Sequence, residues 1–214
     1  MVLTGKIINF LGDSITYGAG VADEENIYTK RIERDYSLTC ANSYGIGGTG
    51  YAEGNQYIKN GDSSFCARVD EMDENADVVV VFGGTNDWGH GVAQVGDFDD
   101  RTDKTFYGSC HVLFTKLIEK YPGKPIVVVT PLHRDIENEL HDKGDRKVTL
   151  KDYVNIIRTV AEYYSLPVCD LYAMSGLQPN VPIIREKFIP DGLHPNDAGH
   201  EIIAERIANF LLDL

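Results

Sequence analysis

Residues 77–84 read DVVVVFGG, four valines and a phenylalanine between an aspartate and a pair of glycines. A second run of this kind, KPIVVVTP, spans residues 124–131. Runs of β-branched residues without polar alternation are typical of strands in a parallel sheet that helices cover on both faces. We therefore expect both segments to be buried strands of an α/β fold.

The rest of the chain alternates between short apolar segments and amphipathic ones. Three further segments are predicted strands: residues 6–12, 37–44 and 166–171. Apolar side chains recur at helical spacing from Leu150 to Tyr164 and from Ala198 to Leu211. Pro195 is expected early in the second of these helices, where proline is tolerated. The alternation implies a parallel sheet with right-handed crossovers, and because no linker or repeat interrupts it we expect one domain over residues 1–214.

Two polar stretches, residues 88–104 and 133–148, follow predicted strands and are expected over the carboxyl edge of the sheet, where open α/β sheets bind ligands. Neither stretch predicts a metal site. The first lacks the glycine and distal glutamate of an EF-hand loop, so a solvated acidic loop is expected. Its aspartates are Asp97, Asp99, Asp100 and Asp103. The histidine pairs 133/141 and 194/200 lack zinc spacing with a third ligand.

Composition excludes several classes of function. Of the 214 residues, 43% are hydrophobic and 25% are charged, and the formal net charge is -13. Because nothing would offset phosphate repulsion, this charge argues against binding to nucleic acid or to an anionic membrane. The four cysteines are widely spaced and form no C-x-x-C pair, so we expect them to be reduced thiols. No segment approaches the roughly 20 apolar residues of a membrane span. The N-terminus lacks the pattern of a signal peptide, so a cytoplasmic location is expected.

The first predicted strand ends in Gly12-Asp13-Ser14. A serine between a buried strand and a helix lies near unsatisfied backbone N–H groups, which stabilise developing negative charge. This position suits a nucleophile, but serine and aspartate are also good helix N-caps, and both interpretations of Ser14 fit the sequence. The same tripeptide recurs at residues 61–63 after a polar segment, where a turn or a cap is predicted.

The segment after the second predicted strand is rich in glycine. Residues 43–50 read SYGIGGTG and contain the G-x-G-x-x-G string of dinucleotide-binding loops. That fingerprint belongs at a first βα turn with an acidic residue at the next strand end, whereas Asp70 and Glu71 here fall in a helical pattern. The alternative is a loop whose amides face an oxyanion. After the third strand, Asn86 is either a cap or turn residue or aims its amide at the same space.

Asp191 and His194 stand in the loop DGLHPN before the last predicted helix. An aspartate three residues before a histidine reaches its Nδ1, which fixes the tautomer and leaves Nε2 to take a proton. A parallel sheet brings its strand ends together. We therefore expect Ser14, the glycine loop, Asn86 and this pair to share one cleft, which would then hold a nucleophile, a base and hydrogen-bond donors.

Four ordered blocks of the chain resemble those of the SGNH, or GDSL-type, hydrolase superfamily. They span essentially the whole sequence: GDSIT at 12–16, the glycine loop at 43–50, GTND at 84–87 and DGLHPN at 191–196. In the second block, Ser43 replaces the asparagine that the family usually has two residues before the first glycine, and Asn42 stands one position earlier. The intact G-x-x-G spacing puts the family's glycine on Gly48, whereas counting from Asn42 puts it on Gly47.

The resemblance implies a role for each matching residue. Ser14 is expected to be the nucleophile, His194 the base and Asp191 the acid that orients it. The backbone amides of Ser14 and Gly48 and the side-chain amide of Asn86 are expected to form the oxyanion hole. The resemblance also implies a three-layer α/β/α sandwich around a parallel five-stranded, flavodoxin-like sheet, and a reaction without metal or cofactor.

The leading hypothesis is a serine esterase that removes small acyl groups, acetyl first among them, from a carbohydrate or related metabolite. The alternatives are a thioesterase or lysophospholipase of the same superfamily, which would need a longer apolar groove, and a non-catalytic binding protein on the same scaffold. Residues beside the motifs are predicted to line the substrate pocket: Asp13, Tyr17, Trp88 and His90. For the aromatic residues the alternative is packing beneath the loops.

Overall fold

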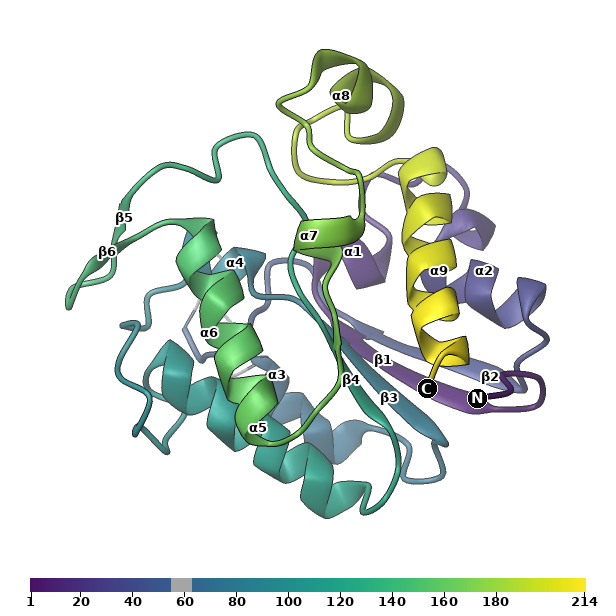
Figure 1. Cartoon of the computed structure of the whole chain (residues 1–214), viewed down its shortest axis with the longest axis horizontal. Coiled ribbons are helices and arrows are strands. Elements are labelled where there is room, and N and C mark those ends of the chain that lie inside the picture. Colours follow the sequence, from purple (N-terminus) through teal and green to yellow (C-terminus); the bar gives the residue numbers. More distant parts are fainter. Residues whose placement is uncertain (55–62) are drawn as a thin grey trace.

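The computed structural model describes residues 1–54 and 63–214. Gly61 and Asp62 of the repeated tripeptide therefore lie outside the described residues. One parallel sheet has the strand order β2-β1-β3-β4-β7 (Figure 1). Its strands are β1 Ile7–Gly12, β2 Cys40–Gly45, β3 Val78–Phe82, β4 Ile126–Val129 and β7 Val168–Cys169. Each overlaps a predicted segment, and the predicted α/β fold with a five-stranded parallel sheet is confirmed.

Helices lie on both faces of this sheet (Figure 1). One face carries α2 Tyr28–Asp35 and α9 Asp197–Leu212, and the other carries α3 Phe65–Arg68, α5 Phe106–Lys120 and α6 Leu150–Tyr163. The other helical segments are short: α1 Ser14–Tyr17, η1 Glu24–Asn26, η2 Val69–Glu71, α4 Thr85–Gly89, α7 Leu171–Met174 and α8 Pro182–Phe188. Among the described helices, none combines the length and the apolar character that crossing a membrane requires.

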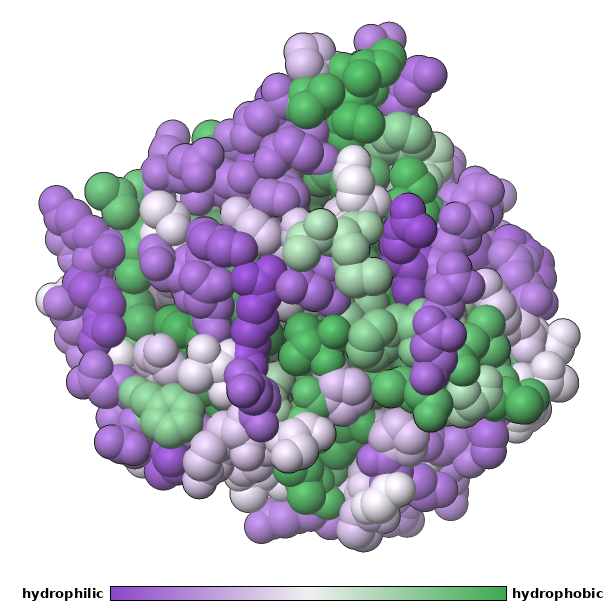
Figure 2. Space-filling model, in the orientation of Figure 1, coloured by the Kyte–Doolittle hydropathy of each residue, from purple (hydrophilic) through white to green (hydrophobic). Residues whose placement is uncertain are grey.

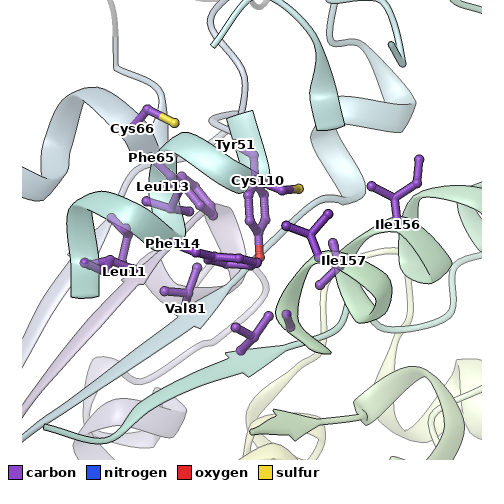
Figure 3. Close-up of a cluster of buried hydrophobic side chains, with 14 of the residues drawn as sticks. Leu11, Tyr51, Phe65, Cys66, Val81, Cys110, Leu113, Phe114, Ile156 and Ile157 are labelled. Carbon is purple, nitrogen blue, oxygen red and sulfur yellow. The ribbon is translucent and has the colours of Figure 1, made fainter. Parts of the chain in front are cut away.

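The run of valines in β3 supplies both halves of the core. Val79 and Val81 pack with α5 and α6 in one apolar cluster (Figure 3). Val78, Val80 and Phe82 point to the opposite face and pack with α2 and α9 in the other cluster. Burying each such side chain stabilises the fold by about 1.5–3 kcal/mol. The run lacks polar alternation because neither face of the strand meets solvent.

The strand register places the ends of β1, β2, β3 and β4 level with one another. Gly12 lies opposite both Gly45 and Phe82, and Phe82 lies opposite Val129. The segments that follow these four strands therefore begin at one edge of the sheet, although they are far apart in the sequence. This edge holds the candidate site.

The last helix begins at Asp197, at least two residues later than expected, since Pro195 was predicted to lie inside it. Asn196 is its N-cap, and the side-chain oxygen of Asn196 accepts a hydrogen bond from Gly199 N–H at 3.1 Å. Pro195 therefore precedes the cap, and its predicted place inside the helix is wrong. The reason is that an asparagine oxygen satisfies a free N–H at a helix start, whereas proline offers no such acceptor.

The polar stretch 133–148 contains a small antiparallel pair that the sequence did not predict, β5 His141–Asp142 and β6 Lys147–Val148. The ring of His141 stacks on Trp88 of α4 with the ring centroids 4.2 Å apart. Further along, α8 projects from the body of the molecule (Figure 1), and apolar side chains gather on this projection (Figure 2). Val181 and Ile183 are the exposed large apolar residues there. Both segments rise above the edge of the sheet that holds the candidate site.

Candidate active site

Ser14 is the first residue of α1, directly after β1. The preceding residue, Asp13, is the N-cap of this helix, and its Oδ1 accepts a hydrogen bond from Ile15 N–H at 3.0 Å. The cap position is therefore filled by the aspartate and not by the serine. The half-buried hydroxyl of Ser14 remains available for chemistry at the sheet edge.

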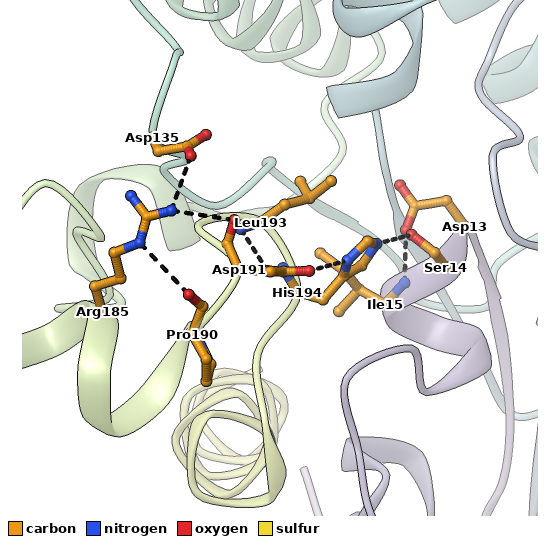
Figure 4. Close-up of polar contacts among 9 residues, drawn as sticks. All are labelled: Asp13, Ser14, Ile15, Asp135, Arg185, Pro190, Asp191, Leu193 and His194. Atoms are coloured by element: carbon orange, nitrogen blue, oxygen red, sulfur yellow. Dashed lines mark hydrogen bonds and ion pairs between the residues drawn. The ribbon is translucent and has the colours of Figure 1, made fainter.

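The structure brings Ser14, His194 and Asp191 into one chain of hydrogen bonds (Figure 4). Ser14 Oγ lies 3.1 Å from His194 Nε2, and His194 Nδ1 lies 2.7 Å from Asp191 Oδ2. Asp191 Oδ1 accepts hydrogen bonds from the backbone N–H groups of Leu193 and His194 at 2.8 and 2.7 Å. Partial burial raises the pKa of Asp191, but these amides and the imidazole outweigh it and hold the pKa below its ordinary value. An ionised carboxylate at Nδ1 leaves Nε2 free to accept the serine proton.

The loop that carries Asp191 is held from two directions (Figure 4). Asp135 N–H donates to Gly192 O at 3.0 Å, which ties the loop to the 133–148 stretch. Arg185 of α8 donates through Nη2 to Asp135 Oδ2 at 3.3 Å and to Asp191 O at 3.4 Å. These contacts limit how far the imidazole can swing away from Ser14.

The glycine loop and Asn86 reach the same place from the neighbouring strands. A Cβ at Gly47 would lie 3.9 Å from Ser14 Cβ, so this backbone passes beside the serine. Gly48 has a φ of 78°, a conformation that favours glycine. Asn86 is buried, and its Nδ2 donates to Thr49 O of the loop at 2.8 Å. Asn86 therefore contacts the same loop that passes beside Ser14.

Arg68 is a supporting residue that the sequence did not single out. Its guanidinium lies under the glycine loop, 3% exposed, and donates to Gly12 O at 3.1 Å, to Thr49 Oγ1 at 2.9 Å and to Tyr44 O. One side chain thus joins the ends of β1 and β2 to the loop. Burial lowers its pKa to about 10, which Asp13 opposes, so the side chain stays charged at neutral pH. The sequence did offer one indication of this role, since Arg68 is a basic residue inside an otherwise apolar helical pattern.

Asp87 holds the other end of the glycine loop. Its two carboxylate oxygens accept hydrogen bonds from Tyr51 N–H at 3.1 Å and Ala52 N–H at 2.9 Å. A side chain at Gly50 would collide with this carboxylate, which explains the third glycine of the G-x-G-x-x-G string. Lys143 Nζ donates a hydrogen bond to the backbone oxygen of Asp87 at 2.7 Å, which ties α4 to the 133–148 stretch. The glycines therefore serve packing against Asp87 and proximity to Ser14.

One of the predicted pocket-lining residues is wrong. Trp88 is 0% exposed, donates through Nε1 to Val148 O at 3.3 Å and packs under the β5–β6 pair, so it packs beneath a loop and does not line a pocket wall. Asp13 is 2% exposed, caps α1 and lines a small cavity next to the site, and its contact with substrate stays a prediction. Tyr17 is 68% exposed beside the site, and its contact with substrate stays a prediction. His90 is half-buried just beyond α4.

The buried carboxyl of Asp13 predicts a pH effect on stability. Burial raises its pKa from 3.8 to about 6, although the Ile15 amide and His194 lower it. Between these values the folded chain binds more protons than the unfolded chain, so Asp13 makes stability fall as the pH rises from about 4 to about 6. Asp13→Asn keeps the cap without the charge. We expect urea unfolding at pH 7 to show a variant more stable than wild type, by up to about 3 kcal/mol.

The matched control is Asp23→Asn, because Asp23 caps η1 at an exposed site with the same type of hydrogen bond, in which its carboxylate accepts from Glu25 N–H two residues on at 3.0 Å. The exposed substitution should leave the pH profile of unfolding unchanged. Superimposable profiles for wild type and Asp13→Asn between pH 4 and pH 7 would contradict the prediction.

The acidic and histidine residues weighed as metal ligands make other contacts. Asp100 Oδ2 accepts from Asp97 N–H at 3.0 Å and from Thr105 Oγ1 at 2.8 Å, within the loop before α5. His133 Nδ1 pairs with Glu137, and His200 Nδ1 accepts from Tyr28 N–H at 3.1 Å. Within residues 1–54 and 63–214, no three His, Cys, Asp or Glu side chains are grouped as a metal site.

Comparisons with known proteins bear on this geometry. A comparison with curated proteins gave no match. One solved structure is 33% identical over 100% of this chain and 99% of its own, with a TM-score of 0.87. A protein from Lactobacillus plantarum is 28% identical over 98% of both chains, with a TM-score of 0.83. An acetyl xylan esterase shares the fold at 24% identity over 95% of this chain and 98% of its own, with a TM-score of 0.65.

The model of the GDSL-like Lipase/Acylhydrolase family matches residues 10–202, which include all four sequence blocks described above. The resemblance inferred from those blocks is thereby confirmed. The chain belongs to the GDSL-like lipase/acylhydrolase family.

Proposed function

We propose that this chain is a serine esterase that hydrolyses small acyl esters, acetyl esters first among them, with acetylated carbohydrates as the candidate natural substrates. The observation that carries the proposal is the continuous contact from Ser14 Oγ through the imidazole of His194 to the carboxylate of Asp191. A hydroxyl, a base and an orienting acid in this order are the parts that acyl transfer to serine requires.

In the first half of the proposed reaction, His194 Nε2 takes the proton of Ser14 Oγ as this oxygen attacks the ester carbonyl carbon. The carbonyl oxygen becomes an oxyanion and is held by the backbone amides of Ser14 and Gly48 and by the side chain of Asn86. The protonated imidazole then gives its proton to the alcohol oxygen, which leaves. The acyl group remains on Ser14 as an ester.

In the second half, water replaces the alcohol. His194 takes a proton from the water as its oxygen attacks the acyl carbon, and Ser14 leaves with that proton. Asp191 stays ionised throughout and stabilises the imidazolium that forms twice in the cycle. The products are a carboxylic acid and the free enzyme.

Asn86→Ala tests the oxyanion role. Removing one preorganised donor is expected to lower kcat by about 10²–10³-fold, since the donor acts on the charge of the transition state. Because Asn86 Nδ2 also donates to Thr49 O, thermal unfolding must show that the glycine loop survives the change. Turnover of 4-nitrophenyl acetate at the wild-type rate would remove Asn86 from the reaction.

A small cavity lies next to the candidate site. A buried cavity behind the site has a volume of about 10 Å³, which is room for about one water molecule. It is lined by residues on either side of the serine and the imidazole: Asp13, Ile15, Phe82, Gly83, Thr85, Pro131, Leu132, His133 and Leu193. Neither Ser14 nor His194 lines this cavity, and its volume is too small even for an acetyl group, so the cavity does not set the length of the acyl chain. The acetyl xylan esterase shares only the fold with this chain. Its name therefore serves only to choose acetylated sugars as the first class of compounds to assay.

Chain-length profiling tests the proposal directly. We expect kcat/KM for 4-nitrophenyl esters to be highest for acetate and to fall as the acyl chain lengthens. A fluorophosphonate probe should label the wild type and fail to label Ser14→Ala. A maximum at long acyl chains would favour a lysophospholipase or thioesterase, and absence of both turnover and labelling would favour a binding protein.

A further inference from the structure

Arg134 lies above the candidate site in the stretch that follows β4. Its Nη1 donates to Thr85 Oγ1 at 3.3 Å, and its guanidinium carbon lies 5.0 Å from the centre of the Trp88 ring. Thr85 directly precedes Asn86, so the guanidinium rests on the same short helix that supplies the proposed oxyanion donor. The cation is thus fixed by stacking and by one long hydrogen bond.

The other side of Arg134 adjoins the loop of the candidate base. The next residue, Asp135, donates its backbone N–H to Gly192 O at 3.0 Å, two residues before His194. Arg134 therefore stands between α4 and the 191–194 loop. In the proposed reaction the imidazole of His194 protonates the leaving oxygen, so the alcohol part of the ester lies on this side.

The guanidinium has hydrogen-bonding capacity that the chain does not use. In the described part of the chain, no carboxylate forms an ion pair with Arg134, and neither its buried Nε nor its Nη2 has a hydrogen-bond partner. By contrast, Arg185 pairs with Asp135, and Arg146 pairs with Asp97 and Asp145. With 33 acidic and 20 basic residues in the chain, carboxylates to pair with are plentiful.

The charge on this side chain is partly desolvated. Burial lowers the pKa of Arg134, and the nearby carboxylates of Asp135, Asp191 and Asp13 oppose that effect. Nε is buried, so Nη2 is the nitrogen of this guanidinium that can donate to an approaching carboxylate or phosphate oxygen. The same three carboxylates repel an approaching anion, whereas salt screens the more distant negative charges of the protein beyond about 8 Å, so recognition of an anion here depends on direct hydrogen bonds from Arg134.

We propose that Arg134 binds an anionic group, a carboxylate or a phosphate, on the alcohol part of the ester. The substrate class is then an acyl ester of an acidic alcohol, such as an acetylated sugar acid or sugar phosphate. This inference rests on the proposed esterase function and names the substrate of the same site. Arg134 is its specificity residue, distinct from the groups that perform the acyl transfer.

The test compares three phenyl acetates that differ only in the substituent at the para position of the ring. The substrates 4-acetoxybenzoate and 4-acetoxyphenyl phosphate carry the anion, and methyl 4-acetoxybenzoate is the neutral reference. For wild type and Arg134→Gln, the ratio of kcat/KM for each anionic ester to that for the neutral ester is measured. A charge-assisted hydrogen bond predicts that the ratio falls about tenfold or more in the variant for at least one anion. The anionic ester whose ratio falls more in Arg134→Gln identifies whether Arg134 prefers a carboxylate or a phosphate.

Two further variants separate charge recognition from packing. Arg134→Lys keeps the charge and should retain part of the preference that Arg134→Gln loses. Arg146→Gln removes the same charge from the exposed surface and should leave both ratios unchanged. Ratios that are equal in wild type and Arg134→Gln for both anions, or that fall equally in Arg146→Gln, would overturn the inference.

A measurement on the wild type covers the case in which Arg134→Gln does not fold. Inhibition of methyl 4-acetoxybenzoate hydrolysis by 4-hydroxybenzoate should be stronger than inhibition by its methyl ester, and added salt should reduce the difference. Equal inhibition would overturn the inference. Hydrolysis of the neutral ester without any anion preference sinks only the role of Arg134, whereas equal inactivity of wild type and Ser14→Ala sinks the proposed function itself.

Discussion

Replacing Ser14 by alanine is expected to lower kcat for 4-nitrophenyl acetate by about 10⁵–10⁶-fold, which is the scale of loss when a serine nucleophile is removed. The methyl side chain cannot form the acyl intermediate, so only the oxyanion donors and binding remain to assist attack by water. The fold should survive, because the N-cap of α1 is the carboxylate of Asp13 and not the serine hydroxyl. Initial rates and thermal unfolding on the same samples check both parts.

The chain supplies a matched control in its second Gly-Asp-Ser tripeptide. Ser63→Ala changes the serine of that copy, whose backbone carbonyl accepts a hydrogen bond from Arg68 Nε at 3.0 Å. Because this contact uses the backbone, the substitution should leave turnover at the wild-type level. Full activity in Ser14→Ala, or loss of activity in Ser63→Ala alone, would show that the nucleophile was assigned to the wrong serine.

Asp191→Asn is expected to lower kcat by about 10⁴-fold at neutral pH. The asparagine oxygen would keep the hydrogen bonds from the N–H groups of Leu193 and His194, and its amide nitrogen would then face His194 Nδ1. An amide donor at Nδ1 favours the tautomer with the proton on Nε2. That nitrogen then cannot accept the proton of Ser14, so the geometry persists while the base is lost.

The control for this change is Asp197→Asn, at the first turn of α9, where Oδ1 accepts a hydrogen bond from Ala22 N–H at 3.0 Å. It removes the same charge near the same loop without contacting the imidazole, and kcat should stay at the wild-type value. Wild-type turnover by Asp191→Asn would leave His194 without an orienting acid and would require a different base.

Local features of the fold were predictable from the sequence. The valines of residues 77–84 and the apolar run at 124–131 became the buried strands β3 and β4, because four consecutive β-branched residues suit a strand with two covered faces. The Asp191–His194 contact is equally local, since three residues on one loop bring the carboxylate to Nδ1. Pro195 shows the limit of such reasoning, since the competition between neighbouring residues for the cap moved the helix start by at least two residues.

In the candidate site, only the residues that directly follow a recognisable strand could be placed from the sequence. Ser14 and Asn86 each follow an apolar run that carries a clear strand pattern, so the level ends of a parallel sheet bring them together. Trp88 follows the same strand end as Asn86, yet its ring lies under the β5–β6 pair. Periodicity assigns a residue to an element, but it does not say which distant segment covers that residue.

The sequence by itself therefore determined the five strands of the parallel sheet, the order of the motifs and the local Asp191–His194 contact. Only the tertiary structure decided that Arg68 joins two strand ends under the glycine loop, that Asp87 packs against Gly50, and that Arg134 lies over the ring of Trp88. The physical reason is that these contacts join residues tens of positions apart, through hydrogen bonds of buried charged groups and through close packing. Such contacts leave no period in the chain, because they depend on which loops the folded sheet brings face to face.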